Sequence, residues 1–537
     1  MKRFPLHLFL FCAFPAVFLY ANNLDYSDFH EFVELALLLL GIAGATWGVI
    51  RVTQSSSGRL QNLLLASFFF GSLYLYGPLN LVLGGIVVSF GISLRVFDYL
   101  LIVILVAFLL FLFGWIKRTS AGALAGLTFF LNMTALVLWG ASLAQVAQYY
   151  SESVPQSARS NLESELSKQI ASGKKVEPLP DIYYIILDGY ARGDVLKTMY
   201  GFDNEPFLSR LRELGFYVAD KSTPNYPQTA LSLASSLNME YLDHLLPGVA
   251  RHNIQLKPFF TLIHQSLIVS LLRREGYSFL CYANGWNSTE NMPADRLLGP
   301  PDDNKLLTLF LGNLNFPGLR DYIARLQHDE FRTKQRYILE NLGNETSAHT
   351  PLFVFAHVVN PHPPFIFQAD GEPRFPGKSF SMEDGEPYGP LQNYRENYLA
   401  QVQFVNRMLL RRISILLETR KDAIVILQGD HGPGSHFHMV RKEDAYLPER
   451  FSIFNAYRLP ASGRERLYNS ISPVNSFRVV LNALFGTNIP LLPDKSFYAS
   501  YLRPFWYREL NQSEIEFHLE VEPPHFDRER LFHSLSQ

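Results

Sequence analysis

Five apolar stretches fill the first 150 residues, and they constrain the fold more than any other feature of the sequence. They lie near residues 5–21, 32–50, 60–77, 97–116 and 122–144. Each is about as long as the helix that is needed to cross the hydrocarbon core of a bilayer. The sequence therefore predicts an N-terminal bundle of about five transmembrane helices.

Charged residues between these stretches predict their orientation. Basic residues precede the first stretch and separate the second from the third and the fourth from the fifth: Lys2, Arg3, Arg51, Arg59, Lys117 and Arg118. The other loops are acidic or weakly charged, so the positive-inside rule places the N-terminus in the cytoplasm and the C-terminal part outside, in a multi-pass plasma (inner) membrane protein. The first stretch also fits a cleaved signal peptide, and either alternative leaves the C-terminal part outside.

The rest of the chain has the composition of an enzyme-sized soluble domain. We expect a solvated linker over residues 151–180, which are rich in Ser, Glu and Lys, and a catalytic domain over 181–537. The net charge of −2 gives no basic excess, so nothing suggests nucleic acid as a partner. Cys12 lies in the first apolar stretch and Cys281 in the soluble part, so no disulfide framework or thiolate metal site is expected.

Strand-like and helical patterns alternate along the soluble part. Short apolar runs predict strands at 182–187, 216–218, 277–282, 352–357, 423–428 and 452–457. Amphipathic patterns predict helices at 206–214, 267–275 and 393–419. This alternation is typical of an α/β domain whose mostly parallel sheet is covered by helices on both faces.

Two of the predicted strands break directly into acidic residues. The strand 182–187 is followed by Asp188, and the strand 423–428 is followed by Gly429, Asp430 and His431. Ligand sites in open α/β sheets lie beyond the carboxyl ends of the strands, so we expect these side chains to meet. Two carboxylates held together repel each other unless a cation lies between them, which predicts a metal site. Taken alone, each residue is equally consistent with an ordinary turn.

A hydroxyl group at a predicted helix start is the candidate nucleophile. Thr229 follows Pro227 and Gln228 and opens a run of Ala, Leu and Ser that is typical of a helix. A helix N-terminus stabilises an alkoxide and an incoming anion, and a metal ion would lower the pKa of the hydroxyl group further. On local grounds Thr229 is equally consistent with a residue that only caps the helix.

Histidines follow two of the predicted strands. His357 and His362 lie on either side of Pro361, in a proline-rich segment that would aim their rings at the ester oxygens of a substrate. His436 and His438, just beyond the Asp430-His431 pair, are candidates for a second metal site. All four histidines are also consistent with structural roles.

The order of these parts resembles the sulfatase branch of the alkaline-phosphatase superfamily, over about residues 181–457. With the preceding apolar stretches, the layout is similar to lipoteichoic acid synthases and lipid A phosphoethanolamine transferases, which carry such a domain outside the membrane. The spacing of Thr229, Ser232, Asn238 and Tyr241 is similar to the motif of the lipoteichoic acid synthases, in which a threonine is the nucleophile.

The resemblance implies a role for each matching residue. Thr229 would be the nucleophile and a metal ligand, and His362 would bind the substrate head group. The other metal ligands would be Asp188, Asp430 and His431. The first ligand is Glu in those transferases but Asp in many sulfatases and phosphatases, as in this chain.

The formylglycine motif of type I sulfatases, Cys/Ser-x-Pro-x-Arg, is not matched. Ser222 and Pro224 come closest, but Tyr226 stands where the arginine is required. We therefore expect a phospho-threonine intermediate, one divalent ion (Zn, Mn, Mg or Ca) and a membrane lipid or lipid-linked substrate. The alternatives are a sulfate-ester hydrolase and a non-catalytic envelope protein that keeps the fold.

Overall fold

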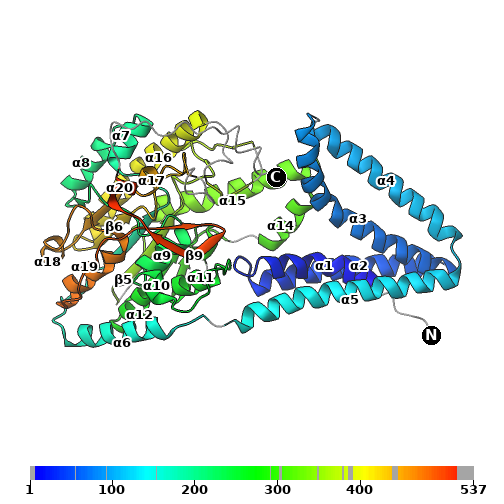
Figure 1. The fold of residues 1–537 in the computed structure, drawn as a ribbon, viewed down its shortest axis with the longest axis horizontal. Helices are drawn as coiled ribbons and strands as arrows, with labels where there is room; N and C mark the ends of the chain where they lie inside the picture. The colour runs from blue at the N-terminus through cyan, green and yellow to red at the C-terminus, as the bar shows by residue number, and fades with distance from the viewer. Residues whose placement is uncertain are drawn as a thin grey trace. The chain divides into compact units, whose positions relative to one another are not determined.

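The chain forms two compact units in a computed structural model (Figure 1). The first comprises Met1–Ser153 with Pro301–Gln327, and the second comprises Val154–Pro300 with His328–Gln537. The structure describes residues 6–54, 56–91, 93–152, 154–290, 292–301, 305–346, 350–377, 380–384, 391–437 and 445–516.

Helices occupy all five apolar stretches of the first unit. They are α1 (Leu6–Asn22), α2 (Phe29–Thr53), α3 (Ser56–Ser89), α4 (Leu94–Arg118) and α5 (Ala121–Ser151). Helices α2 to α5 each contain a segment that is long and apolar enough to cross a membrane, whereas α1 is a shorter apolar helix of 17 residues. The chain is thus a membrane protein with four helices of membrane length in its described part, and the fifth span stays a prediction.

The first unit also contains a segment that the sequence analysis did not assign to it. Helix α14 (Lys305–Leu314) buries Leu306 and Phe310 against α1, α2 and α3. The Lys305 backbone N–H donates to the Glu31 carboxylate at 2.9 Å. A segment between the predicted strands at 277–282 and 352–357 therefore returns to the apolar bundle.

The second unit is built on a seven-stranded sheet. Its strand order is β2-β7-β6-β1-β5-β3-β4, and only β7 runs against the others. The strands are β1 (Ile182–Leu187), β2 (Tyr217–Val218), β3 (Ser278–Tyr282), β4 (Arg296–Leu298), β5 (Leu352–Val358), β6 (Ile424–Gln428) and β7 (Asn455–Arg458). The mostly parallel sheet is confirmed, and β4 is the strand that the apolar pattern did not predict.

Both faces of the sheet are covered because successive strand residues point to opposite sides. Ile182, Tyr184 and Ile186 of β1 pack into one core, and Tyr183, Ile185 and Leu187 into the other. The first core includes α6 (Ser157–Ser172), α9 (Thr229–Ser236), α10 (Leu242–Leu245), α11 (Lys257–His264), α12 (Leu267–Arg274) and α19 (Pro473–Phe485). The second includes α7 (Gly193–Tyr200), α8 (Glu205–Glu213), α15 (Leu319–Asn341) and α16 (Leu391–Thr419).

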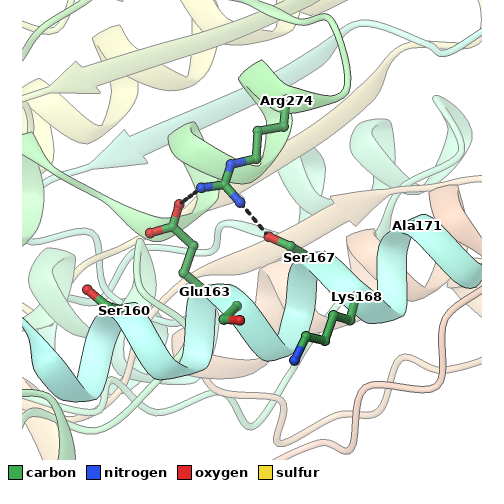
Figure 2. A pocket seen from close by; sticks show the side chains of 7 residues that line it. Ser160, Glu163, Ser167, Lys168, Ala171 and Arg274 are labelled. Carbon is green, nitrogen blue, oxygen red and sulfur yellow. Dashed lines mark hydrogen bonds and ion pairs between the residues drawn. The ribbon is translucent and has the colours of Figure 1, made fainter.

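Smaller elements complete this unit. They are α13 (Asn287–Glu290), α17 (Leu447–Arg450), α18 (Ala461–Arg464), α20 (Gln512–Ile515) and a hairpin of β8 (Phe497–Ser500) and β9 (Arg503–Glu509). Within the segment predicted as a linker, α6 buries Leu166 and Ile170 in the first core. A shallow groove of about 560 Å³ lies on α6. There the Arg274 guanidinium donates hydrogen bonds to the Glu163 carboxylate and the Ser167 hydroxyl group (Figure 2).

Candidate metal centre and nucleophile

The predicted site residues meet at the carboxyl ends of three neighbouring strands. In the register of the sheet, Leu187 of β1 lies beside Val358 of β5, and Ile186 lies beside Gln428 of β6. The chain segments that follow these strands therefore leave the middle of the sheet at one level. This is where ligand sites form in open parallel sheets.

Four side-chain atoms converge there. The Nε2 atom of His431 lies 3.4 Å from Oδ1 of Asp188, 3.3 Å from Oδ2 of Asp430 and 3.2 Å from Oγ1 of Thr229. Thr229 Oγ1 is also 3.4 Å from the second Asp188 oxygen. All four residues are buried. Ligands bonded to one metal ion at about 2.0–2.1 Å in a tetrahedral site lie about 3.3 Å apart, so this spacing fits a bound cation.

The orientation of His431 turns its Nε2 lone pair toward the candidate ligands, where the Arg450 guanidinium also donates to it at 3.2 Å. Its Nδ1 atom lies 3.0 Å from the carbonyl oxygen of Gly432, which can only accept, so Nδ1 carries the proton. The Nε2 atom then faces the carboxylates as an unprotonated acceptor. Burial and the nearby Arg450 lower the pKa of His431 to about 3, which keeps the ring neutral at physiological pH.

Two buried carboxylate oxygens support the same conclusion. Oδ1 of Asp188 and Oδ2 of Asp430 have no hydrogen-bond partner although both are inaccessible to solvent. Their other oxygens are satisfied by His357 Nε2 at 3.2 Å and by the Gly189 backbone N–H at 3.1 Å, respectively. A buried acceptor without a donor is costly, and a cation between the two oxygens would remove that cost.

The pKa values of the two aspartates are shifted in opposite directions. Burial and the negative charge of Asp188 raise the pKa of Asp430 well above its ordinary value. Burial also acts to raise the pKa of Asp188, but His362, His357 and His431 outweigh it and lower that pKa. Asp430 is therefore the carboxylate with the higher proton affinity, and a bound cation would favour its charged form.

Thr229 is the first residue of α9 and does not cap it. Gln228 occupies the capping position, and the Thr229 hydroxyl group donates to Asp188 Oδ2 at 3.4 Å while its oxygen lies 3.2 Å from His431 Nε2. The hydroxyl oxygen therefore lies at a helix N-terminus beside the candidate metal ligands. That is the position expected of a nucleophile that attacks an anionic ester.

The histidines predicted as substrate contacts occupy different positions. His357 uses both ring nitrogens within the protein, with Asp188 at 3.2 Å and the Thr289 hydroxyl group at 2.9 Å. His362 donates from Nδ1 to the Pro363 carbonyl oxygen at 2.6 Å, and its Nε2 atom lies 3.8 Å from Oδ2 of Asp384. Asp188, His362 and His431 offer ligand atoms within 4.8 Å of one another.

His436, one of the two candidates for a second metal site, is not gathered with this group. His436 is buried, and its Nδ1 atom lies 2.8 Å from the Ser435 hydroxyl oxygen and 3.4 Å from the Glu449 carboxylate. His438 lies outside the described residues. Within the described residues, the grouping of potential metal ligands is Asp188, His362 and His431.

Sequence reasoning missed a buried arginine that holds the site together. Arg450 donates to the Pro227 carbonyl oxygen at 2.8 Å, to the Gly432 carbonyl oxygen at 3.0 Å and to Asp384 at 2.6 Å. It thereby links the segment before Thr229 to the segment after His431. Burial acts to lower the pKa of Arg450, but Asp384 outweighs it and raises that pKa. The only signal for this role in the sequence was a basic residue a few positions before β7, the last strand of the sheet in chain order.

Replacing Arg450 by glutamine is expected to destabilise the second unit by about 3–5 kcal/mol, because the buried Asp384 carboxylate loses its cationic partner. The measurement is the midpoint of thermal or urea unfolding of the purified full-length protein. The matched control, Arg466→Gln, changes an exposed arginine and should stay within about 0.5 kcal/mol. Equal midpoints for the two variants would contradict the role given to Arg450.

Gly432 has no room for a side chain. A Cβ atom at this position would overlap the carbonyl oxygens of Glu449 and Arg450. We expect Gly432→Ala to cost about 1–3 kcal/mol of stability and to weaken metal binding, because the segment that carries His431 must move. Unfolding and metal titrations of the full-length protein check this, and unchanged values in both would contradict it.

Comparisons with known proteins agree with this description. The family model named Sulfatase matches residues 180–456. A search of curated protein sequences finds no match.

Solved structures are similar at low sequence identity. The C-terminal periplasmic domain of EcEptC from Escherichia coli, in complex with Zn, is 10% identical, with a TM-score of 0.40, over 63% of this chain and 94% of that chain. The phosphonate monoester hydrolase of Agrobacterium radiobacter is 15% identical, with a TM-score of 0.36, over 59% and 80%. The lipooligosaccharide phosphoethanolamine transferase A from Neisseria meningitidis is 12% identical, with a TM-score of 0.34, over 89% and 95%.

The family match is the finding that classifies the chain. It covers more than half of the sequence and spans all the residues gathered at the candidate metal centre. The predicted enzyme class, with chemistry at phosphate or sulfate esters, is confirmed. This membrane protein belongs to the sulfatase family.

Proposed function

We propose that the protein transfers or hydrolyses the phospho-head group of a lipid-linked ester on the outer side of the membrane, with Thr229 as the nucleophile. The observation that carries this proposal is the position of the Thr229 hydroxyl group. It lies at a helix N-terminus, 3.2 Å from the neutral His431 nitrogen and beside two carboxylates with unpartnered oxygens.

In the first step, Thr229 Oγ1 forms a bond to phosphorus while the bond between phosphorus and the leaving alcohol breaks. The hydroxyl proton passes along the hydrogen bond to Asp188 Oδ2, 3.4 Å away, and the departing oxygen takes up a proton from water, so that the leaving group is released as an alcohol. Water or a second alcohol then attacks the phospho-threonine and regenerates the hydroxyl group. A divalent ion held by Asp188, Asp430, His431 and Thr229 would supply a lowered pKa for the hydroxyl group and stabilise charge on the phosphoryl oxygens.

The neighbouring histidines have separate roles in this proposal. His357 positions Asp188, because its Nε2–H donates to one carboxylate oxygen and leaves the other free for the cation. His362 lies beside Asp188 and His431, so it is the candidate contact for the substrate head group or an additional ligand. His436 is a weaker candidate because the protein already engages its ring.

The distribution of basic residues between the helices supports a catalytic unit on the outer side of the membrane. Anchoring to the membrane raises the effective concentration of a lipid-linked ester, which favours head-group transfer over the hydrolysis of soluble esters.

A formylglycine mechanism for sulfate esters gains no support from the geometry. Ser222, the nearest match to the modified residue, donates to the Ile471 carbonyl oxygen at 2.7 Å and accepts from Asn455 at 3.0 Å. Both contacts hold it within the core, whereas Thr229 occupies the position beside the candidate ligands.

The test is turnover of matched soluble esters by the purified full-length protein supplied with divalent ions. We expect hydrolysis of an aryl phosphate mono- or diester to exceed that of the corresponding aryl sulfate. A preference for the sulfate ester would contradict the proposal. Incubation with native membrane lipids then separates transfer from hydrolysis by the product that forms.

A further inference from the structure

The β8–β9 hairpin exposes a compact group of large apolar side chains. Tyr501, Leu502 and Trp506 are 38%, 61% and 49% exposed, and the Arg503 guanidinium lies 5.7 Å from the centre of the Trp506 ring. Other large exposed apolar residues in the described part of this unit are scattered: Val176, Ile254, Leu297 and Phe375. Scattered apolar residues are ordinary on a protein surface, but a group of three within six positions points to a partner.

The inner side of this hairpin is attached to the segment that carries the nucleophile. The Gln228 side chain donates to the Ala499 carbonyl oxygen at 2.9 Å, and the Phe497 backbone N–H donates to the Asn225 carbonyl oxygen at 2.8 Å. The rings of Tyr226 and Phe497 stack with their centres 5.5 Å apart. Asn225 and Gln228 therefore attach the hairpin to the segment that precedes Thr229. Gln228 is the residue directly before Thr229.

Tyr501 interacts electrostatically with residues of the candidate site. Burial of its hydroxyl group raises the pKa of Tyr501 to about 12; Arg450 acts to lower this pKa, whereas Asp384 and Asp188 act to raise it. Tyr501 is thus within electrostatic reach of the site while over a third of its surface is exposed. Figure 1 shows the hairpin, with β9 in red.

The geometry points to a lipid surface as the partner of this hairpin: Tyr501, Leu502 and Trp506 enter the head-group region of the bilayer, and Arg503 meets lipid phosphates. Trp and Tyr together with a basic residue are the side chains that favour a membrane interface. The described part of the chain contains four helices of membrane length, so a bilayer is the surface to which the protein is anchored. A hairpin fixed to the Thr229 segment would thereby present the nucleophile to lipid-linked esters. This last consequence rests on the proposed function, whereas the lipid contact does not.

The direct test labels the tip of the full-length protein in lipid nanodiscs. Cys12 and Cys281 are both buried, so a Leu502→Cys variant can be labelled selectively with an environment-sensitive fluorophore. We expect a blue-shifted emission and quenching by lipids with brominated acyl chains. Ile254→Cys, which is 68% exposed on another loop, is the matched control and should not be quenched. Quenching at residue 502 no stronger than at residue 254 would overturn the proposal.

A second measurement separates this inference from the proposed reaction. Leu502→Asp and Trp506→Asp should lower the ratio of lipid-ester to soluble-ester turnover about tenfold, since burying one such side chain is worth about a factor of ten or more in affinity. Ile254→Asp should leave the ratio unchanged. An unchanged ratio in the hairpin variants would overturn the role in substrate presentation. If the unmodified protein turns over neither ester, the proposed function fails, while the quenching result still decides the lipid contact.

Discussion

Replacing Thr229 by alanine is expected to lower turnover of phosphate esters at least about 1,000-fold, because the oxygen that forms the covalent intermediate is removed. The fold should be retained: Gln228, not Thr229, occupies the N-cap position of the helix, and the lost hydroxyl group makes contacts within the site alone among the described residues. The measurement is kcat for an aryl phosphate with the full-length protein, at saturating divalent ion.

Two variants control for the loss. Thr229→Ser keeps a hydroxyl group at the same position and should retain measurable turnover. Ser235→Ala removes a buried hydroxyl group from the same helix, where it donates to the Glu240 carbonyl oxygen, and should keep kcat within a fewfold of the unmodified protein. If Thr229→Ala retained more than a tenth of the activity, Thr229 would not be the nucleophile.

Replacing Asp430 by asparagine is expected to abolish both metal binding and turnover. The substitution keeps the shape of the side chain and the acceptor for the Gly189 backbone N–H, but it removes the negative charge beside Asp188. Loss of a residue that only hydrogen-bonds to a metal ligand weakens metal affinity about 10–100-fold. Loss of a ligand itself should therefore weaken metal affinity more than about 100-fold. Metal content after dialysis and the affinity for added Zn, Mn, Mg and Ca are the measurements.

The matched control lies at the other end of the same strand. Asp422 precedes β6 and is exposed. Asp422→Asn therefore also removes one carboxylate charge, but at a position outside the site. Chelation should inactivate the unmodified protein, and readdition of a divalent ion should restore it. Retention of a bound ion by Asp430→Asn at the affinity of the Asp422→Asn control would exclude Asp430 as a ligand.

The sheet and the centre of the site could be predicted because they depend on local patterns. The apolar runs of β1, β5 and β6 are buried on both faces, which gives a continuous signal in the sequence, and all three strands appear within a residue or two of the predicted positions. Since parallel neighbours end at one level, Asp188 and Asp430 were expected to meet without any knowledge of the loops.

The parts that could not be predicted depend on contacts between distant segments. Arg450 reaches Pro227, across more than two hundred residues of sequence, and Asp384 lies in a segment with no regular pattern. The apolar composition of α14 is shared by helices in any core, so nothing local showed that it packs with the bundle of the first unit. The β8–β9 hairpin was not among the predicted strands, and the exposure of its apolar side chains is known only from the structure.

The most direct test of the central claim is the chemical state of Thr229 during turnover. The full-length protein is incubated with native membrane lipids, quenched in acid, digested and examined by mass spectrometry. The account predicts a phosphoryl or phospho-head-group adduct on the peptide that contains Thr229, and its loss in Thr229→Ala. An adduct on Ser222 or another residue, or continued adduct formation in Thr229→Ala, would contradict it.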